Sequence, residues 1–308
     1  MTIGVAAAGH LAGAAVYDTV LAAELLGRGA IGGFAVFAVL LPDGRLEYRT
    51  TQREGITSLA LPPAWREAEL AAVISSGPDR PEPLTQFVAG EAGAGLVTGH
   101  RLPHLTGGDG VPLNRSVLQR MAHGDVPQAA VDAVLGAHAE WDVGLVALDV
   151  RGNIGLANSA RVARRDDLGH FIRQSNGTSV ALLHNSIYAR GALAEQLGEV
   201  AWSTLTGVPS VLRFVTLARP TPLATATRDR VDIDALGCIT GIATANARLA
   251  RLDRRCTVIY LGTEVWCEGE MVGRATTELY VEARNGVVQP ASLAANNMFM
   301  MRSAHVAP

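Results

Sequence analysis

Residues 141–159 read WDVGLVALDVRGNIGLANS, and this stretch decides the fold more than any other part of the chain. An apolar run leads into the turn Arg151-Gly152-Asn153, and a second run of small and apolar residues follows. A short glycine- and asparagine-containing turn between two such runs is typical of a β-hairpin. The stretch therefore predicts adjacent antiparallel strands over 143–149 and 154–158.

On both sides of this hairpin the sequence alternates between helix patterns and strand patterns. Asp125 is predicted to cap a helix that has Pro127 in its first turn, with Gln128 completing a capping box. Sheets built from hairpins and covered by helices predict an α/β protein with a layered αββα sandwich. Apolar spacing predicts helices over 13–26, 112–121, 126–135, 191–204 and 232–252, and strands over 32–41, 45–50, 71–75, 93–98, 180–184, 209–217, 257–266 and 271–283.

The hairpin resembles the catalytic-core hairpin of N-terminal-nucleophile (Ntn) hydrolases, in particular the isoaspartyl peptidase/asparaginase group. In that group a threonine nucleophile directly precedes a Val-Gly-x-Val-Ala-Leu-Asp-x-x-Gly-Asn run. Here Asp142 stands in the position of that threonine. The resemblance implies an Ntn-hydrolase-like αββα sandwich, but the expected nucleophile is absent at this position.

A second resemblance extends the match to about residues 90–160. The segments AGAGLVT (92–98), LNRSVLQRM (113–121) and GDVPQAAVDAVL (124–135) resemble, in order and spacing, bacterial Ntn-hydrolase-like domains without assigned function. We therefore predict an Ntn-like core over residues 1–175. Residues 176–308, which the resemblance does not cover, are predicted either to complete the same sandwich or to form a second small domain.

The start of the chain resembles the same bacterial group, which also opens with Met-Thr followed by a strand, as Met1-Thr2-Ile3-Gly4-Val5 does here. In an Ntn mechanism, removal of Met1 exposes the α-amine of Thr2. That amine serves as general base for the threonine's own hydroxyl, which attacks an amide carbonyl. The resemblance thus makes Thr2 a candidate nucleophile.

Composition excludes several other classes of chemistry. The chain has 308 residues and no lysine, so all 26 Lys/Arg side chains are arginine. Schiff-base chemistry, Walker-type phosphate binding and Ser-Lys dyads are therefore excluded. A net charge of −3 without a basic stripe predicts no nucleic-acid partner. No metal site or cofactor is expected, because the three cysteines are widely spaced and Pro103 separates His100 from His104.

The predicted location is a reduced, cytoplasmic one. The apolar N-terminal segment lacks a basic region and is interrupted by His10, Asp18 and Glu24, so it is expected to be neither a signal peptide nor a membrane span. The methionine-rich stretch 298–301 is expected to pack in a core or in an interface between subunits of a homo-oligomer.

Several strands are followed at once by polar loops, which is where α/β sandwiches carry their sites. We predict that six residues surround one pocket for a small anionic molecule, with arginine forks binding its carboxylate. Ser159 and His184, at the ends of two strands, join Thr2 as catalytic candidates. The six pocket residues are Ser76, Arg80, His100, Arg101, Asn158 and Arg161.

Three functions are consistent with these patterns. The first is hydrolysis of an amide or cyclic-amide C–N bond in a small carboxylate-bearing metabolite. The second is a catalytically idle sandwich that binds a small ligand or assembles subunits, because Asp142 replaces the family threonine. The third is a pseudo-threefold cyclic-imide-opening hydrolase, based on hairpin turns at Gly44, Gly152 and Gly269 with a spacing of roughly 110 residues. In the C-terminal half, Glu264 lies within an apolar strand and is expected to be paired, exposed or functional.

Overall fold

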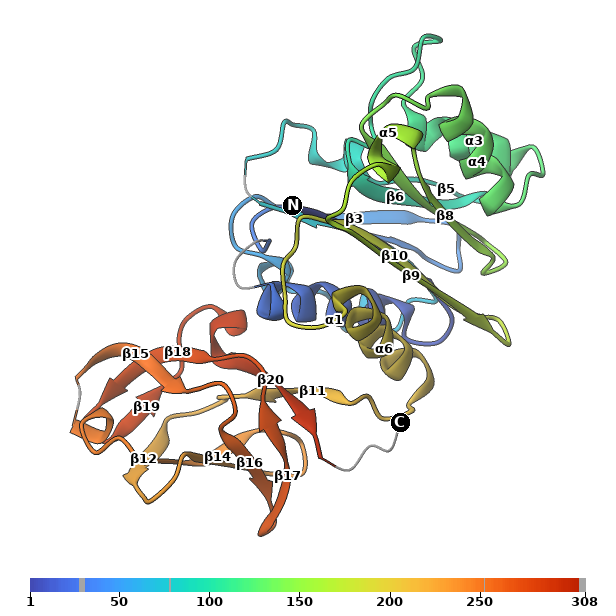
Figure 1. The fold of residues 1–308 in the computed structure, drawn as a ribbon. Coiled ribbons are helices and arrows are strands. Elements are labelled where there is room, and N and C mark those ends of the chain that lie inside the picture. The colour runs from blue at the N-terminus through green and yellow to red at the C-terminus, as the bar shows by residue number, and fades with distance from the viewer. Residues whose placement is uncertain (28–30, 78, 252, 305–308) are drawn as a thin grey trace. The chain divides into compact units, whose positions relative to one another are not determined.

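The computed structural model describes residues 1–27, 31–77, 79–251 and 253–304 (Figure 1). The chain divides into two compact units, Met1–Val208 and Pro209–Pro308. Both helices and strands occur, so the predicted mixed α/β class is confirmed. None of the described helices is both long and apolar enough to cross a membrane.

The larger sheet of unit 1 has six strands in the order β3-β2-β4-β1-β10-β9, and every neighbouring pair is antiparallel. Its central strands are almost completely buried, which explains why they read as continuous apolar runs in the sequence. The strands are β1 (Thr2–Ala8), β2 (Ala35–Leu40), β3 (Leu46–Thr51), β4 (Leu70–Ser76), β9 (Leu168–Ser175) and β10 (Thr178–Asn185).

The smaller sheet of unit 1 contains the predicted hairpin. Strands β7 (Val143–Asp149) and β8 (Ile154–Asn158) pair antiparallel, which confirms that prediction, and Gly152 takes a positive φ in the turn between them. The sheet order is β5-β6-β7-β8, with β5 spanning Ala89–Glu91 and β6 spanning Gly95–Arg101.

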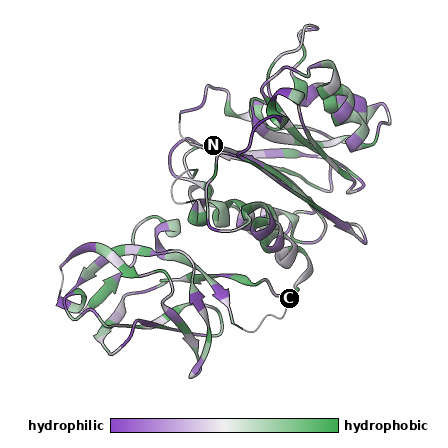
Figure 2. Cartoon of the chain, viewed as in Figure 1, coloured by the Kyte–Doolittle hydropathy of each residue, from purple (hydrophilic) through white to green (hydrophobic). Residues whose placement is uncertain are grey.

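The two sheets pack face to face through a buried apolar core that includes Ala6, Ile74, Leu96 and Val146. Helices α1 and α6 cover the outer face of the six-stranded sheet, and α3 and α4 cover the outer face of the four-stranded sheet (Figure 1). Hydrophobic residues, green in Figure 2, run along the strands of both sheets. The helices of unit 1 are α1 (Ala12–Leu26), α2 (Pro63–Arg66), α3 (Leu113–Ala122), α4 (Pro127–Ala137), α5 (Ala160–Ala163) and α6 (Leu193–Thr206), with short 3-10 turns at Ile56–Leu59 and Leu84–Phe87.

Glycine is required where the two sheets approach most closely. A Cβ atom on Gly4 of β1 would lie 2.2 Å from the carbonyl oxygen of Gly99 in β6. Real Cβ atoms essentially never come so close to a backbone atom, so any larger residue at position 4 would push the sheets apart.

The boundary between the units lies after Val208, within the range 176–308 that was predicted either to complete the first sandwich or to form a second small domain. Strand β10 pairs along its whole length with β1, and α6 packs against α1. Residues 176–208 therefore belong to the core of unit 1, because the central strand β1 would otherwise lack a partner on one side.

The described residues of unit 2 form strands and short 3-10 turns, so the helix predicted over 232–252 is wrong for residues 232–251, while residue 252 lies outside the described residues. Val231 and Ile233 are buried on one face of β13, Ile239 and Ile242 are buried in β14 on either side of a register shift, and Gly237 takes a positive φ in the turn between these strands. The strands are β11 (Leu212–Thr216), β12 (Thr221–Thr225), β13 (Arg230–Ile233), β14 (Ile239–Thr244), β15 (Arg254–Ile259), β16 (Glu264–Cys267), β17 (Glu270–Ala275), β18 (Leu279–Arg284), β19 (Val287–Gln289) and β20 (Met298–Ser303), with 3-10 turns at Leu249–Arg251 and Ala294–Asn297.

Two further sequence interpretations need correction. The cap of α4 is Val126 without a side-chain hydrogen bond, because Asp125 pairs with Arg120 at 2.7 Å. The hairpins that turn at Gly44, Gly152 and Gly269 lie in three different sheets spread over two unlike units, so their spacing does not reflect three copies of one unit.

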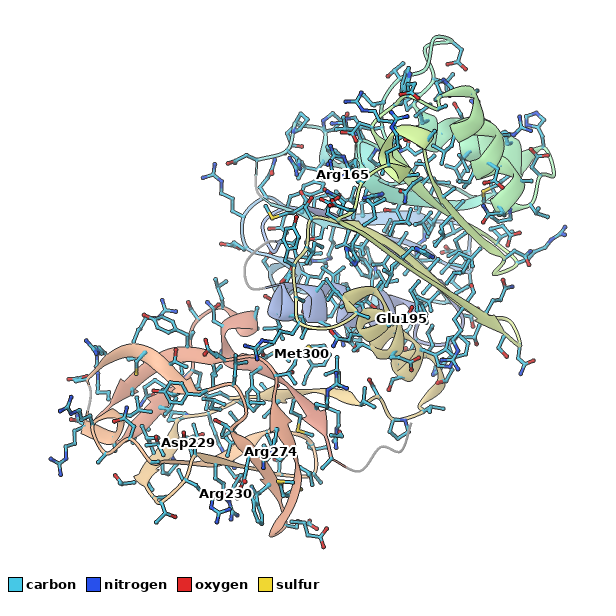
Figure 3. The ribbon with its side chains drawn as sticks, in the orientation of Figure 1. Arg165, Glu195, Asp229, Arg230, Arg274 and Met300 are labelled. Carbon is cyan, nitrogen blue, oxygen red and sulfur yellow. The ribbon has the colours of Figure 1, made fainter. Side chains whose placement is uncertain are left out.

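Glu264 in β16 is paired, which was one of the three possibilities predicted for a carboxylate in this apolar strand. Its carboxylate lies 3.1 Å from Arg274, which Figure 3 labels, and accepts a 3.2 Å hydrogen bond from the indole of Trp266. The hydrogen bond from Trp266, with Arg228 and Arg274 nearby, lowers the pKa of Glu264. This carboxylate therefore belongs to a surface network of unit 2.

Glu24 of α1 should make the stability of unit 1 depend on pH. Its carboxylate accepts a 2.8 Å hydrogen bond from the amide of Ile56, and burial raises its pKa from 4.5 to about 7. A raised folded-state pKa means that the stabilisation is present below pH 4.5 and is lost as the pH rises through about 7.

We therefore expect Glu24→Gln to raise the free energy of unfolding at pH 8 by about 1–3 kcal/mol and to flatten its pH dependence. Urea unfolding at several pH values measures both effects. Glu91→Gln, at an exposed position in β5, is the control and should change neither. An unchanged pH dependence in Glu24→Gln would contradict the prediction.

Candidate functional site

The first residue of β1, Thr2, lies at one end of the space between the two sheets. Side chains alternate along a strand, and Ala6 and Ala8 belong to the core between the sheets, so Thr2 faces the same way. Its direct neighbours are Ser76 at the end of β4 and Asn185 at the end of β10. Three polar strand-end residues therefore meet at this end of the larger sheet.

Thr2 lines a cavity of about 260 Å³ at this end of unit 1. Burial and the nearby cations Arg101 and Arg80 lower the pKa of the Met1 α-amino group. The cavity walls are mostly charged or aromatic, and they include Thr2, Arg80, Phe87, Arg101, His104 and Asp142.

Arg80 is held at the rim of this cavity through both its backbone and its side chain. The Gln52 side chain donates to the Arg80 carbonyl at 2.7 Å and accepts from the Arg80 amide at 3.0 Å. The Arg80 Nε donates to the Ser76 hydroxyl at 2.8 Å. Among the described residues no carboxylate pairs with this guanidinium, so its outer nitrogens can bind an anion.

Arg101 and Asp142 form a two-bond ion pair in the cavity wall. Arg101 Nε donates to Asp142 Oδ1 at 2.5 Å, and Nη2 donates to Oδ2. Arg101 has a φ of 65°, a conformation that is uncommon for residues other than glycine. Asp142 therefore holds the Arg101 side chain in place.

His104 forms part of the apolar side of the cavity. Its ring packs on Phe87 with centroids 4.2 Å apart, and burial lowers its pKa. The Nδ1 atom of His104 is buried and has no hydrogen-bond partner in the described part of the chain. A neutral imidazole next to Thr2 can donate or accept one hydrogen bond to a ligand.

Behind the cavity, the fully buried His100 lies in a chain of hydrogen bonds. Its Nδ1 contacts Asn185 Oδ1 at 3.0 Å, and Asn185 Nδ2 donates to the Ser186 hydroxyl at 3.0 Å. The Ser186 hydroxyl donates to Asp167, whose carboxylate is held by Arg165 (labelled in Figure 3). Those hydrogen bonds lower the pKa of Asp167 to about 2.

This chain constrains the protonation of His100. The bond from Asn185 to Ser186 orients the Asn185 oxygen toward His100, so Nδ1 carries a hydrogen. Burial lowers the pKa of His100, which makes the neutral ring the stable form near pH 7. Its Nε2 lies 2.6 Å from Asn158 Oδ1. A neutral ring that donates from Nδ1 can only accept at Nε2, so this contact becomes a hydrogen bond when the Asn158 amide is rotated to turn its NH₂ group toward the ring.

The structure brings most of the predicted pocket residues to this one end of unit 1. Arg80 and Arg101 line the cavity beside Thr2, and Ser76 contacts Arg80. His100 and Asn158 form the buried network behind it.

Three predicted site residues lie elsewhere. Arg161 is exposed on α5 and reaches the Glu140 carbonyl at 3.5 Å. The Ser159 hydroxyl donates to the Trp141 carbonyl at 2.5 Å and caps α5 by accepting from the Val162 amide. His184 pairs with Ile3 rather than with Thr2, so its side chain faces the helices and not the cavity.

Asn185, Gln52 and the pairing of Asp142 with Arg101 were missed by the sequence analysis. Asn185 directly follows the candidate His184, so strand alternation could have directed attention to it. Within the described residues, no group of three or more His, Cys, Asp or Glu side chains is arranged to hold a metal ion.

Two family models match the chain, and both are described only as domains of unknown function. No curated protein matches the chain. A family model described as domain of unknown function DUF7259 matches residues 220–296, within unit 2. A model described as domain of unknown function DUF6963 matches residues 2–214, which contain unit 1 from Thr2 onward. The chain belongs to the DUF6963 family.

Proposed function

We propose that unit 1 is an Ntn-hydrolase-like αββα sandwich that hydrolyses an amide or cyclic-amide C–N bond in a small carboxylate-bearing molecule. One observation carries this proposal. Thr2, at the start of a central strand, lines a cavity together with two arginines. Its hydroxyl is the only aliphatic hydroxyl among the described cavity residues, and Arg80, which pairs with no carboxylate among the described residues, is suited to binding one.

In the proposed reaction, removal of Met1 leaves Thr2 with a free α-amine. The amine takes the proton of the Thr2 hydroxyl while the oxygen attacks the carbonyl carbon of the substrate. The C–N bond then breaks, and the leaving nitrogen receives that proton. Water hydrolyses the resulting ester, which releases the acid and restores the threonine hydroxyl.

Arg80 is the proposed partner of the substrate carboxylate. The charge of Arg101 is already neutralised by Asp142. Arg80 uses only its Nε to donate a hydrogen bond to Ser76, so its two terminal nitrogens are available to a ligand. Asp142 then keeps Arg101 in place and limits its charge, so the α-amine of Thr2 faces less positive potential than two unpaired arginines would create.

We expect Arg80→Gln to raise KM for the carboxylate substrate by about 10- to 100-fold while leaving kcat less affected. The substrate is first selected from a panel of N-acylated amino acids, side-chain amides and cyclic amides by amine or ammonia release. Arg53→Gln is the matched control, because Arg53 is exposed and pairs with Asp79. Equal KM values for Arg80→Gln and wild type would remove Arg80 from the proposed site.

The bidentate Arg101–Asp142 pair also favours a second candidate, a sandwich that binds a small anion without turnover, because an aspartate replaces the family threonine. Thermal shift combined with product analysis distinguishes the two candidates. If a compound from the same panel raises the thermal midpoint of the protein but is recovered intact after prolonged incubation, the protein binds it without hydrolysing it.

A further inference from the structure

A second cavity of unit 1, with a volume of about 430 Å³, opens on the other side of the six-stranded sheet. His184 lies in its wall, and because His184 precedes Asn185 in β10, the two side chains face opposite sides of that sheet. The other walls come from the chain around Asp166–His170 and from the start of α6. This cavity is therefore separate from the one at Thr2.

The first turn of α6 contributes free backbone donors to this cavity. Helix α6 has 14 residues, and its cap, Ala192, offers no side-chain acceptor. The first amide bonded within the helix is that of Gln196, which donates to the Ala192 carbonyl at 3.0 Å. The amides of residues 193–195 thus lack helical partners, and the helix dipole makes this end favourable for an anion such as a carboxylate.

His184 independently indicates that a ligand belongs here. It is 5% exposed, and neither ring nitrogen has a hydrogen-bond partner among the described residues. Burying such groups without partners is unfavourable. A Cβ on Gly169, the cross-strand neighbour, would lie 2.1 Å from His184 Nε2, so glycine there gives the ring its room.

The remaining wall residues define the ligand further. Asp166 and Glu195 are exposed carboxylates of the cavity wall, and Asp167, which also lines it, is paired with Arg165. No arginine lies among the described lining residues. Burial lowers the pKa of His184 to about 4, so near pH 7 the neutral ring can accept a hydrogen bond from an ammonium group. Ile187 and Leu193 supply an apolar surface.

We propose that this cavity binds a free α-amino acid with an apolar side chain. The carboxylate of the ligand binds the amides at the start of α6, and its ammonium group binds His184 and Glu195. Ile187 and Leu193 contact its side chain. This second site does not depend on the hydrolytic reaction proposed above.

Calorimetric titration of the full chain with L-leucine, 4-methylpentanoate and 3-methylbutylamine tests the proposal, because the last two each lack one charged group of leucine. We expect saturable binding of L-leucine at millimolar concentration, and binding weaker by about tenfold or more for each analogue. No saturable binding of L-leucine, or equal affinity for either analogue, would overturn the proposal.

Two variants locate the binding site. His184→Phe keeps a ring of similar size and should weaken leucine binding by about tenfold. Ala192→Asp, at an exposed position, should cap α6 and exclude the ligand carboxylate while preserving the thermal midpoint. His123→Phe is the exposed control, and Thr2→Ala should leave leucine binding intact. Unchanged affinity in a folded Ala192→Asp variant would contradict the proposed carboxylate position.

Discussion

Replacing Thr2 with alanine is expected to lower the amide-hydrolysis activity roughly 10⁴-fold or more, the order of effect that follows loss of a hydrolase nucleophile. The reason is chemical, because alanine at position 2 leaves the α-amine in place but removes the oxygen that attacks the carbonyl. The measurement is kcat/KM on the substrate selected from the amide panel.

Two further variants of the chain distinguish a catalytic role of Thr2 from a structural one. Thr2→Ser keeps a hydroxyl and should retain substantial activity. An N-terminal extension that cannot be removed should abolish activity with Thr2 unchanged, because it blocks the α-amine that acts as base. Full activity in either Thr2→Ala or the extended protein would exclude Thr2 as an N-terminal nucleophile.

Gly4→Ala is expected to lower the free energy of unfolding by about 3 kcal/mol, a large share of the stability of an ordinary domain. The added Cβ would lie 2.2 Å from the Gly99 carbonyl oxygen, and both residues belong to strands in sheet interiors that cannot move alone. Urea unfolding followed by circular dichroism measures the change. Because Gly4 and Thr2 share a strand face, catalytic activity should fall as well.

Gly136→Ala is the matched control for that substitution. Gly136 lies in α4, and a Cβ there would meet nothing within 4 Å. Alanine is favoured over glycine in a helix, so this variant should gain up to about 1 kcal/mol of stability. A Gly4→Ala protein as stable as wild type would contradict the close approach of β1 to β6.

The sequence predicted those parts of the fold that depend on local pattern. The 143–158 hairpin formed as expected, because its turn residues and buried runs agree with each other. The 232–252 segment was misread because its alanines favour a helix, whereas its stability comes from burying Ile233, Ile239 and Ile242 in the core of unit 2. Such long-range burial leaves no local signal.

The candidate site was predictable only in part for a similar reason. Arg80 follows β4 and Arg101 is the last residue of β6, and both line the same cavity, so the rule that polar residues at the ends of buried strands form sites found them. His184, a catalytic candidate in the sequence, lies on the other face of β10 because strand register, which the sequence does not specify, decides which face a residue occupies. Asn185, one residue later, occupies the inner face and contacts His100.

The central claim is that Thr2 becomes a free N-terminal nucleophile in the cavity lined by Arg80 and Arg101. Tandem mass spectrometry of the untagged protein after incubation with a carboxylate-bearing β-lactone tests it most directly, because ring opening by a nucleophilic hydroxyl leaves the whole lactone attached as an ester. We predict a chain that lacks Met1 and carries the acyl group on Thr2, with labelling reduced in Arg80→Gln. A chain that retains Met1, or an acyl group on another residue with Thr2 unmodified, would contradict the claim.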